Sequence, residues 1–310
     1  MSQYQSALST VAGQSRSEPV HVLLDTDIGD DIDDAFALAL VLRSPELTLH
    51  GVTTVFGDTH LRARLAKHLL RVYGREDIPV APGISSPLLA RHRPSGAPQA
   101  AILDPCENLA TGAYNGPELI VQKALTYPGQ LTLICIGPLT NVATALRMEP
   151  RLFMAIRRVI VMGGTSGLPF PEWNVRSDAA AARMVLASGI PITLLGMNIT
   201  MRCQLEPGDI ARLRDCDTPQ ARLLSKLLAV WQRHRPRWQS PYPYLHDPLT
   251  IAALCVPQFL RFEEMTARVL LDGPLRGVMV PRIMDGPLVQ AAVDIKANEA
   301  REWVMGRLSP

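Results

Sequence analysis

From His21 onward, short apolar runs alternate with longer amphipathic stretches along the chain. This alternation is typical of a parallel sheet whose strands are connected by helices. The predicted strands are His21–Leu24, Leu49–Val55, Leu131–Ile136, Val159–Met162 and Ile192–Leu195. The predicted helices are Asp33–Leu42, His60–Tyr73, Pro117–Thr126, Asn141–Met148 and Asp178–Ala187. The pattern therefore predicts an α/β protein with a mainly parallel open sheet and flanking helices.

A different pattern begins late in the chain. Apolar and polar residues alternate in Thr266–Leu271, Val278–Met284 and Leu288–Ile295, before a final predicted helix over Glu299–Leu308. A period of two is typical of strands, so we predict a small antiparallel addition near the C-terminus. No repeat, linker or composition shift marks a boundary, and we expect residues 19–310 to form one domain. Residues 1–18 are polar and rich in Ser and Gln, and we expect a flexible N-terminal arm.

Composition excludes several classes of function. The 310 residues contain 31 Lys and Arg against 29 Asp and Glu, with no block of basic residues, so we expect no nucleic-acid partner. The longest clearly apolar run, Ala35–Leu42, is far shorter than the ~20 residues that span a bilayer, so we expect no membrane partner. Five scattered cysteines without a C-x-x-C pair argue against a disulfide framework or a thiolate zinc site. This usage favours a reducing, cytoplasmic location.

An acidic loop follows the first predicted strand. Its sequence from Asp25 to Asp34, DTDIGDDIDD, holds six carboxylates within ten residues. Two unit charges about 5 Å apart repel by about 3 kcal/mol at an effective dielectric constant near 20, so the loop requires positive charge. The predicted helix start at Asp33 and Asp34 supplies part of it. Carboxylate oxygens select hard cations for the rest, Ca²⁺ or Mg²⁺.

The same residues also allow two other interpretations of the acidic loop. A solvated acidic turn that caps a helix would need no cation. The start Asp25-Thr26-Asp27 also resembles the nucleophile loop of haloacid-dehalogenase-type phosphatases, which implies a Mg²⁺-dependent phosphatase with a phosphoaspartate at Asp25. Such an enzyme also needs a downstream lysine, and Lys67, Lys123 and Lys226 lack a convincing context for that role.

The chain resembles the inosine–uridine preferring nucleoside hydrolase family on four motifs, in the family's order. The family signature Asp-x-Asp-x-Gly-x-Asp-Asp-Ala corresponds to Asp25–Ala35, which is two residues longer and leaves Asp30 and Asp31 without an assigned role. The other three motifs are Ile136–Asn141, the pair of segments Val161–Gly164 and Glu172–Asn174, and His246–Pro248.

The resemblance implies the nucleoside hydrolase fold and Ca²⁺-dependent hydrolysis of a ribonucleoside to free base and ribose, in purine or pyrimidine salvage. It implies that calcium is bound by Asp27, Asp34, Asp247 and the backbone carbonyl of Ile136. Asp27 would be the general base for a metal-bound water. His246 would protonate the leaving base, because its unperturbed pKa of ~6.5 lies near working pH.

The resemblance also implies the residues that hold the nucleoside. The ribose-binding residues would be Asp33, Met162, Glu172, Trp173 and Asn174. The family's usual Val-Gly-Asn after the second strand reads Phe56-Gly57-Asp58 here, and we expect Asp58 to line the site.

An aromatic segment precedes His246 and includes Trp231, Trp238, Tyr242 and Tyr244. In the family this region closes over the nucleobase, and aromatic faces stack on bases. We therefore expect Trp238 and Tyr242 to contact substrate. Packing of the last helices, or a subunit interface, would explain the same side chains, and we expect a homo-oligomer, either a dimer or a tetramer.

A third candidate function is a catalytically silent, calcium-stabilised protein that binds a nucleoside or ribose. It is suggested by Asp58 and by the missing match to the family's His-Gly loop near Ala90–Gly112. The sequence leaves the nucleobase open.

Overall fold

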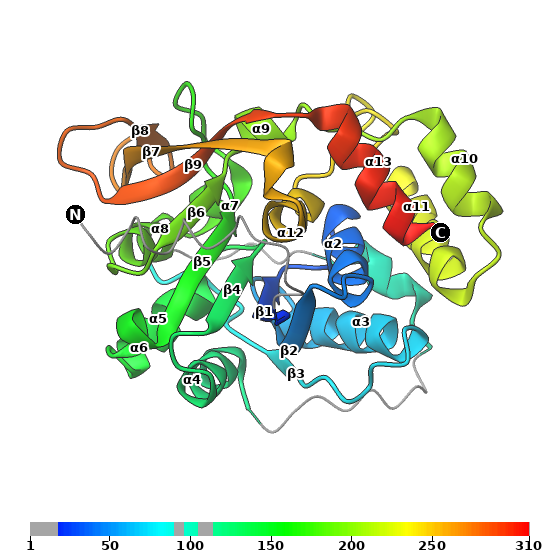
Figure 1. The fold of residues 1–310 in the computed structure, drawn as a ribbon, viewed down its shortest axis with the longest axis horizontal. Helices are drawn as coiled ribbons and strands as arrows, with labels where there is room; N and C mark the ends of the chain where they lie inside the picture. The colour runs from blue at the N-terminus through cyan, green and yellow to red at the C-terminus, as the bar shows by residue number, and fades with distance from the viewer. Residues whose placement is uncertain (1–17, 90–95, 105–113, 310) are drawn as a thin grey trace.

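A nine-stranded sheet runs through the protein in the order β3-β2-β1-β4-β5-β6-β9-β7-β8. The structure is a computed structural model that describes residues 18–89, 96–104 and 114–309. Nearly all of the predicted N-terminal arm and much of the segment near Ala90–Gly112 lie outside the described residues. Figure 1 shows helices on both sides of the sheet, as the sequence pattern predicted.

Most of the strands agree with the predicted ones. Their bounds are β1 Val20–Thr26, β2 Leu47–Thr54, β3 Val80–Pro82, β4 Leu131–Cys135, β5 Ile156–Met162, β6 Ile192–Leu195, β7 Leu260–Val269, β8 Met279–Pro281 and β9 Leu288–Ile295. Neighbouring strands from β3 through to β9 are parallel, whereas β7 is antiparallel to both β9 and β8. The mainly parallel sheet with a small antiparallel part near the C-terminus is therefore confirmed.

The helices connect these strands. Their bounds are α2 Asp33–Leu42, α3 Thr59–Val72, α4 Gly116–Thr126, α5 Thr140–Met148, α6 Leu152–Ala155, α7 Trp173–Ser177, α8 Ala179–Leu186, α9 Met197–Thr200, α10 Pro207–Asp215, α11 Pro219–His234, α12 Pro248–Cys255 and α13 Ala297–Leu308. Two 3₁₀ helices, η2 and η3, span Pro98–Ile102 and Pro257–Phe259. No helix in these described ranges is long and apolar enough to span a membrane.

Each face of the sheet has its own hydrophobic core. Side chains along a strand point alternately to the two faces, so Val22 and Leu24 belong to one core and Leu23 to the other. Helices α2, α3, α11, α12 and α13 contribute to the first core, and α4, α5 and α8 contribute to the second (Figure 1). The helices on both faces explain why the central strand β4 is buried throughout.

Several elements differ from those predicted from the sequence. Strand β3 has only three residues and was not predicted, since so short a segment carries no period. Strand β7 begins at Leu260 rather than Thr266, because charged residues interrupt the apolar pattern of its first half. Helices α10 and α11 were also not predicted, although Thr218 caps α11 and Pro219 occupies its first position, a recognised start signal.

Candidate active site

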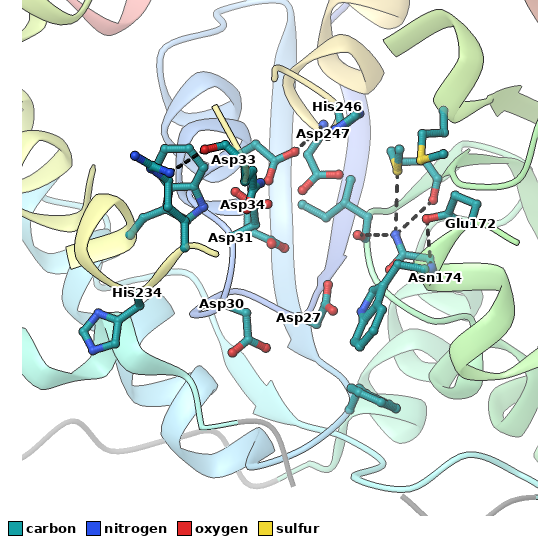
Figure 2. Close-up of a pocket in the computed structure, with 18 of the residues that line it drawn as sticks. Asp27, Asp30, Asp31, Asp33, Asp34, Glu172, Asn174, His234, His246 and Asp247 are labelled. Atoms are coloured by element: carbon teal, nitrogen blue, oxygen red, sulfur yellow. Dashed lines mark hydrogen bonds between the residues drawn. The ribbon is translucent and has the colours of Figure 1, made fainter. Parts of the chain in front are cut away.

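A cavity of about 610 Å³ opens at the carboxyl ends of the parallel strands. Asp27 follows β1, Phe56 follows β2, Ile136 follows β4, and Met162 ends β5. Ligand sites of open α/β sheets form at this edge, because the loops there converge. Figure 2 shows the aspartates of the acidic loop between His234 on one side and Glu172 and Asn174 on the other. Most of the predicted site residues line this cavity; the exceptions are Asp58, Trp238 and Tyr242.

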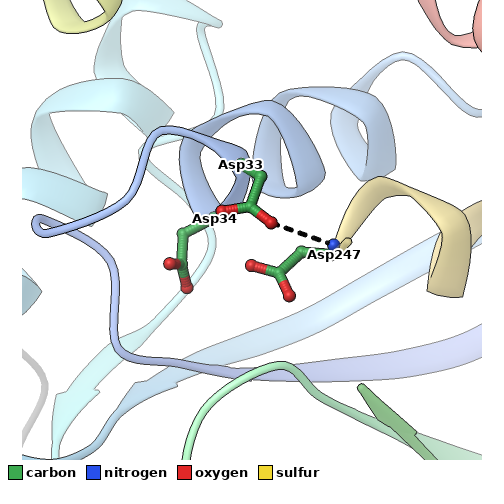
Figure 3. Close-up of side chains that lie close together, drawn as sticks. All are labelled: Asp33, Asp34 and Asp247. Atoms are coloured by element: carbon green, nitrogen blue, oxygen red, sulfur yellow. Dashed lines mark hydrogen bonds between the residues drawn. The ribbon is translucent and has the colours of Figure 1, made fainter. Parts of the chain in front are cut away.

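Three buried carboxylates form the most concentrated charge in the cavity. Asp33, Asp34 and Asp247 each offer an oxygen, and these oxygens lie within 4.8 Å of one another (Figure 3). Burial raises the pKa of each carboxyl group well above its usual range, and the charges of neighbouring aspartates raise it further. A cation among them offsets both effects, and carboxylate oxygens are the ligands that hard divalent ions prefer. The cluster is therefore a candidate metal site.

The packing of two helices brings these carboxylates together. Helix α2 begins at Asp33, and α12 begins directly after Asp247. Both helices are apolar around most of their circumference, so they are buried against each other and the sheet. Their N-termini favour negative charge, and the backbone N–H of Asp247 donates to Asp33 at 3.2 Å. The Thr26 hydroxyl donates to Asp34 at 2.5 Å and fixes that carboxylate.

Asp27 and Ile136 line the same cavity, but Asp27 is not part of the trio of carboxylates. The trio contains Asp33 instead, which the sequence analysis assigned to the sugar. Burial raises the pKa of Asp27 to about 7, and the charge of Arg62 opposes this shift. The carbonyl oxygen of Ile136 accepts a hydrogen bond from the Asn174 amide at 2.9 Å.

His246 lines the cavity beside the trio. Its Nδ1 is 2.6 Å from the Thr200 hydroxyl, so Nε2 is the ring nitrogen left for the cavity. Burial lowers the pKa of His246 to about 4, and the imidazole is therefore neutral at neutral pH before substrate binds.

Glu172 and Asn174 are held in place by backbone groups. The Glu172 carboxylate accepts hydrogen bonds from the N–H groups of Gly164, Asn174 and Val175, at 2.8 to 3.0 Å. It thus caps helix α7 and fixes the glycine turn after β5. Trp173, between them in sequence, is 60% exposed and lies edge-on to Phe56, with ring centroids 6.3 Å apart.

Comparison with known proteins shows the family. The profile described as inosine-uridine preferring nucleoside hydrolase matches residues 22–302. The chain belongs to this family. It is 32% identical to a "Probable uridine nucleosidase 2" of Arabidopsis thaliana, over 93% of this chain and 97% of that protein. It is 34% identical to a "Pyrimidine-specific ribonucleoside hydrolase RihA" of Klebsiella pneumoniae subsp. pneumoniae, over 81% of this chain and 85% of that protein.

Solved structures agree with this assignment. The structure titled "Plant nucleoside hydrolase - PpNRh1 enzyme" matches with a TM-score of 0.83 and 27% identity, over 94% of this chain and 99% of that one. The nucleoside hydrolase fold is therefore confirmed, and this nucleoside hydrolase is an enzyme that cleaves the N-glycosidic bond of ribonucleosides.

In this nucleoside hydrolase, three predicted site residues lie apart from the cavity. Asp58 is exposed and caps α3, because its carboxylate accepts from the Leu61 N–H at 2.9 Å. Trp238 is 86% exposed, and Tyr242 packs partly buried against the core. Part of the cavity wall is instead supplied by other residues of the same segment, namely Trp231, His234, Arg235 and Gln239.

Asp25 also has a different role from that in the phosphatase alternative. It is fully buried, and its carboxylate accepts from the Thr53 hydroxyl at 2.5 Å and the Asn141 amide at 2.7 Å. Asn141 in turn donates to the Thr54 carbonyl at 3.0 Å. Asp25 therefore connects β1 to β2 and α5, and it lacks the exposure that a phosphoryl-accepting nucleophile needs.

Proposed function

We propose that this enzyme hydrolyses ribonucleosides with Ca²⁺ held at the aspartate cluster, in a purine or pyrimidine salvage role. The observation that supports this most is the set of converging oxygens of Asp33, Asp34 and Asp247, all nearly buried. Asp27 and the Ile136 carbonyl line the same cavity and are proposed to complete the ligand set. Oxygen-only donors fit a hard cation such as Ca²⁺. When bound, this ion supplies Lewis acidity to a water molecule and orientation to the sugar hydroxyls.

Asp27 is proposed as the general base. Its carboxylate is buried and lines the cavity together with the trio, so it can accept a proton from a water molecule there. Asp33 and Asn174 face the same space and are proposed to hydrogen-bond the ribose hydroxyls. Glu172 acts on the sugar site through the turn and helix that it fixes.

His246 is proposed to stabilise the departing base. In the arrangement that we propose, the Thr200 hydroxyl donates to Nδ1, so Nε2 carries the hydrogen and points it toward the base. The neutral imidazole then donates a hydrogen bond that strengthens as negative charge develops on the base. The oxocarbenium-like sugar and the leaving base are thus stabilised by different residues.

The test is a reducing-sugar assay across a panel of nucleosides, before and after treatment with a chelator. Uridine is the first substrate to test, because relatives carry the names uridine nucleosidase and pyrimidine-specific ribonucleoside hydrolase. We expect ribose release that the chelator abolishes and Ca²⁺ restores. Full activity after complete chelation would refute the metal assignment, and micromolar nucleoside binding without turnover would favour the catalytically silent alternative.

We further propose that the protein is cytoplasmic and forms a homo-oligomer, either a dimer or a tetramer. The scattered cysteines suit a reducing compartment. Exposed apolar side chains at Leu168, Phe170 and Trp173 suit a subunit contact near the cavity. A solution mass equal to one chain, measured by light scattering, would contradict the oligomer.

A further inference from the structure

Arg62 is a fully buried arginine on helix α3 that connects two loops of the active site. Its Nε donates to the Phe56 carbonyl at 2.6 Å, and Nη1 donates to the Ile28 carbonyl at 2.9 Å. Nη1 also donates to the carbonyl of Asp27, and Nη2 binds the Asp30 carboxylate at 2.6 Å. One planar group therefore joins the loop after β1 to the loop after β2.

Phe56 depends on this contact. Its φ of 64° lies in the left-handed region, which is costly for an aromatic residue and marks a constrained backbone. This conformation turns its carbonyl onto Arg62 and its ring into the cavity wall, edge-on to Trp173. The guanidinium thus stabilises a strained residue that lies against the substrate space.

Asp30 is the counter-ion of Arg62. It lies in the part of the acidic loop that is longer than the family signature, and its side chain is 41% exposed while that of Arg62 is 0% exposed (Figure 2 labels Asp30 and Asp27). A buried guanidinium without a paired anion is strongly unfavourable. The ion pair with Arg62 therefore fixes the position of the longer loop and balances the charge of the Asp30 carboxylate.

Helix η2 holds the other side of the acidic loop through Gln99. The Gln99 amide, on η2, donates to the Asp31 carbonyl at 2.6 Å, and the Gln99 N–H donates to the Gly29 carbonyl at 3.1 Å. At Gly29, with φ of 127°, an added Cβ would approach Ala97 Cβ to 2.9 Å. The loop is therefore packed between α3 and η2, with little room to shift.

We propose that Arg62 is a positioning residue of this active site, with Asp30 as its counter-ion. It sets the place of Asp27 through two main-chain carbonyls, and the place of the Phe56 ring through a third. This inference rests on the proposed function, because Asp27 is the proposed base. Lysine at this position offers a point charge rather than a planar fork, and it is unable to bind both loops at once.

The test compares Arg62→Lys and Asp30→Asn with Arg64→Lys, a partly exposed arginine on the same helix that contacts the carbonyl of Asp104. For Arg62→Lys we expect kcat to fall by about 10² with KM changed by less than about threefold, since displacing a base by about 1 Å mainly affects the transition state. Calcium affinity by titration calorimetry should fall by about tenfold, as for residues that orient metal ligands. Asp30→Asn should lower kcat by about threefold to tenfold, and Arg64→Lys should match the wild type.

Hydrogen exchange gives a readout that needs neither substrate nor metal. Amides of residues 27–32 and 56–57 should exchange faster in Arg62→Lys than in Arg64→Lys. Wild-type kcat, calcium affinity and exchange in Arg62→Lys would overturn the inference. If that variant does not fold by circular dichroism, wild-type kcat and exchange in Asp30→Asn would overturn it. A wild-type protein that cleaves no nucleoside would refute the proposed function instead, and exchange alone would then decide the role of Arg62.

Discussion

The aspartates of the acidic loop share one side-chain chemistry but lie in different environments. Asp25 is fully buried and accepts from neutral donors, and burial raises its pKa to about 7. Asp30 is partly exposed and pairs with Arg62. Asp34 accepts from the Thr26 hydroxyl and faces Asp247. Environment, and not residue type, therefore separates the aspartates that hold the fold from those that offer oxygens to a cation.

Calcium binding should depend on the carboxylate trio. Asp34→Ala or Asp247→Ala removes one converging oxygen donor, and we expect loss of stoichiometric calcium by elemental analysis of the dialysed protein. Asp58→Ala is the matched control, because Asp58 is exposed and caps α3. That control should keep its calcium and lose only about 1 kcal/mol of stability. Calcium retained at one equivalent in both trio variants would contradict the assignment.

The loss of activity on removing His246 should be larger for a poor leaving group than for a good one. His246→Ala should slow hydrolysis of uridine by about 10² to 10⁴, because the departing base loses its hydrogen-bond donor. A p-nitrophenyl riboside needs no such help and should lose much less. The measurement is kcat/KM for both substrates, and equal losses would remove His246 from this role.

At the scale of elements, helix α11 shows how burial divides similar residues. Trp231 is 3% exposed and contributes both to the core and to the cavity wall, whereas Trp238 follows the helix and is 86% exposed. The helix period explains this, since Trp231 continues the apolar face of Leu224, Leu227 and Leu228.

The different burial of Trp231 and Trp238 should be reflected in the free energy of unfolding of their alanine variants. Trp231→Ala should lower the free energy of unfolding by about 3–5 kcal/mol, because it leaves a cavity in the core. Trp238→Ala should change it by less than about 0.5 kcal/mol. Urea titrations followed by circular dichroism measure both free energies, and similar losses would contradict the different burial of the two indoles.

At the scale of the whole molecule, the C-terminal helix α13 is bound to the segment that precedes β2. Arg307 on α13 makes two hydrogen bonds to Glu46, just before β2, at 2.6 and 2.7 Å. Arg307 also lies over the Trp303 ring, 4.4 Å from its centroid. The hydrogen bonds from Arg307 hold the pKa of Glu46 below its usual value.

The stabilisation from this pair should depend on pH. A lowered folded-state pKa gives stability that is present above the unfolded pKa of about 4.5 and is lost as the pH falls through the folded value. Glu46→Gln should therefore be less stable than the wild type by about 0.5–1 kcal/mol at pH 7, and the difference should shrink below pH 4.5. Glu302→Gln, exposed on the same helix, is the control for urea titrations at both pH values. A difference independent of pH would argue against the ion pair.

The pattern along the chain was enough to predict most strands, the helices that follow them and the acidic loop. Helix α2 was predicted with the bounds that the structure has, because its apolar run and its Asp33–Asp34 start are local features. The residues Ile136, Glu172 and Asn174 were named from the resemblance to the family, and all three line the cavity. The short strand β3 was not predicted, because a segment of three residues is too short to show a period.

Only the tertiary structure decided which side chains meet. Asp33 and Asp247 are 214 positions apart, and the packing of α2 against α12 brings them together. Asp58 caps a helix outside the cavity, while Arg62, four residues later, is buried between two loops. Sequence periodicity reports which face of an element is buried, but hydrogen bonds between distant loops depend on how the elements pack. For that reason the acidic loop was visible in the sequence, whereas its buried arginine was not.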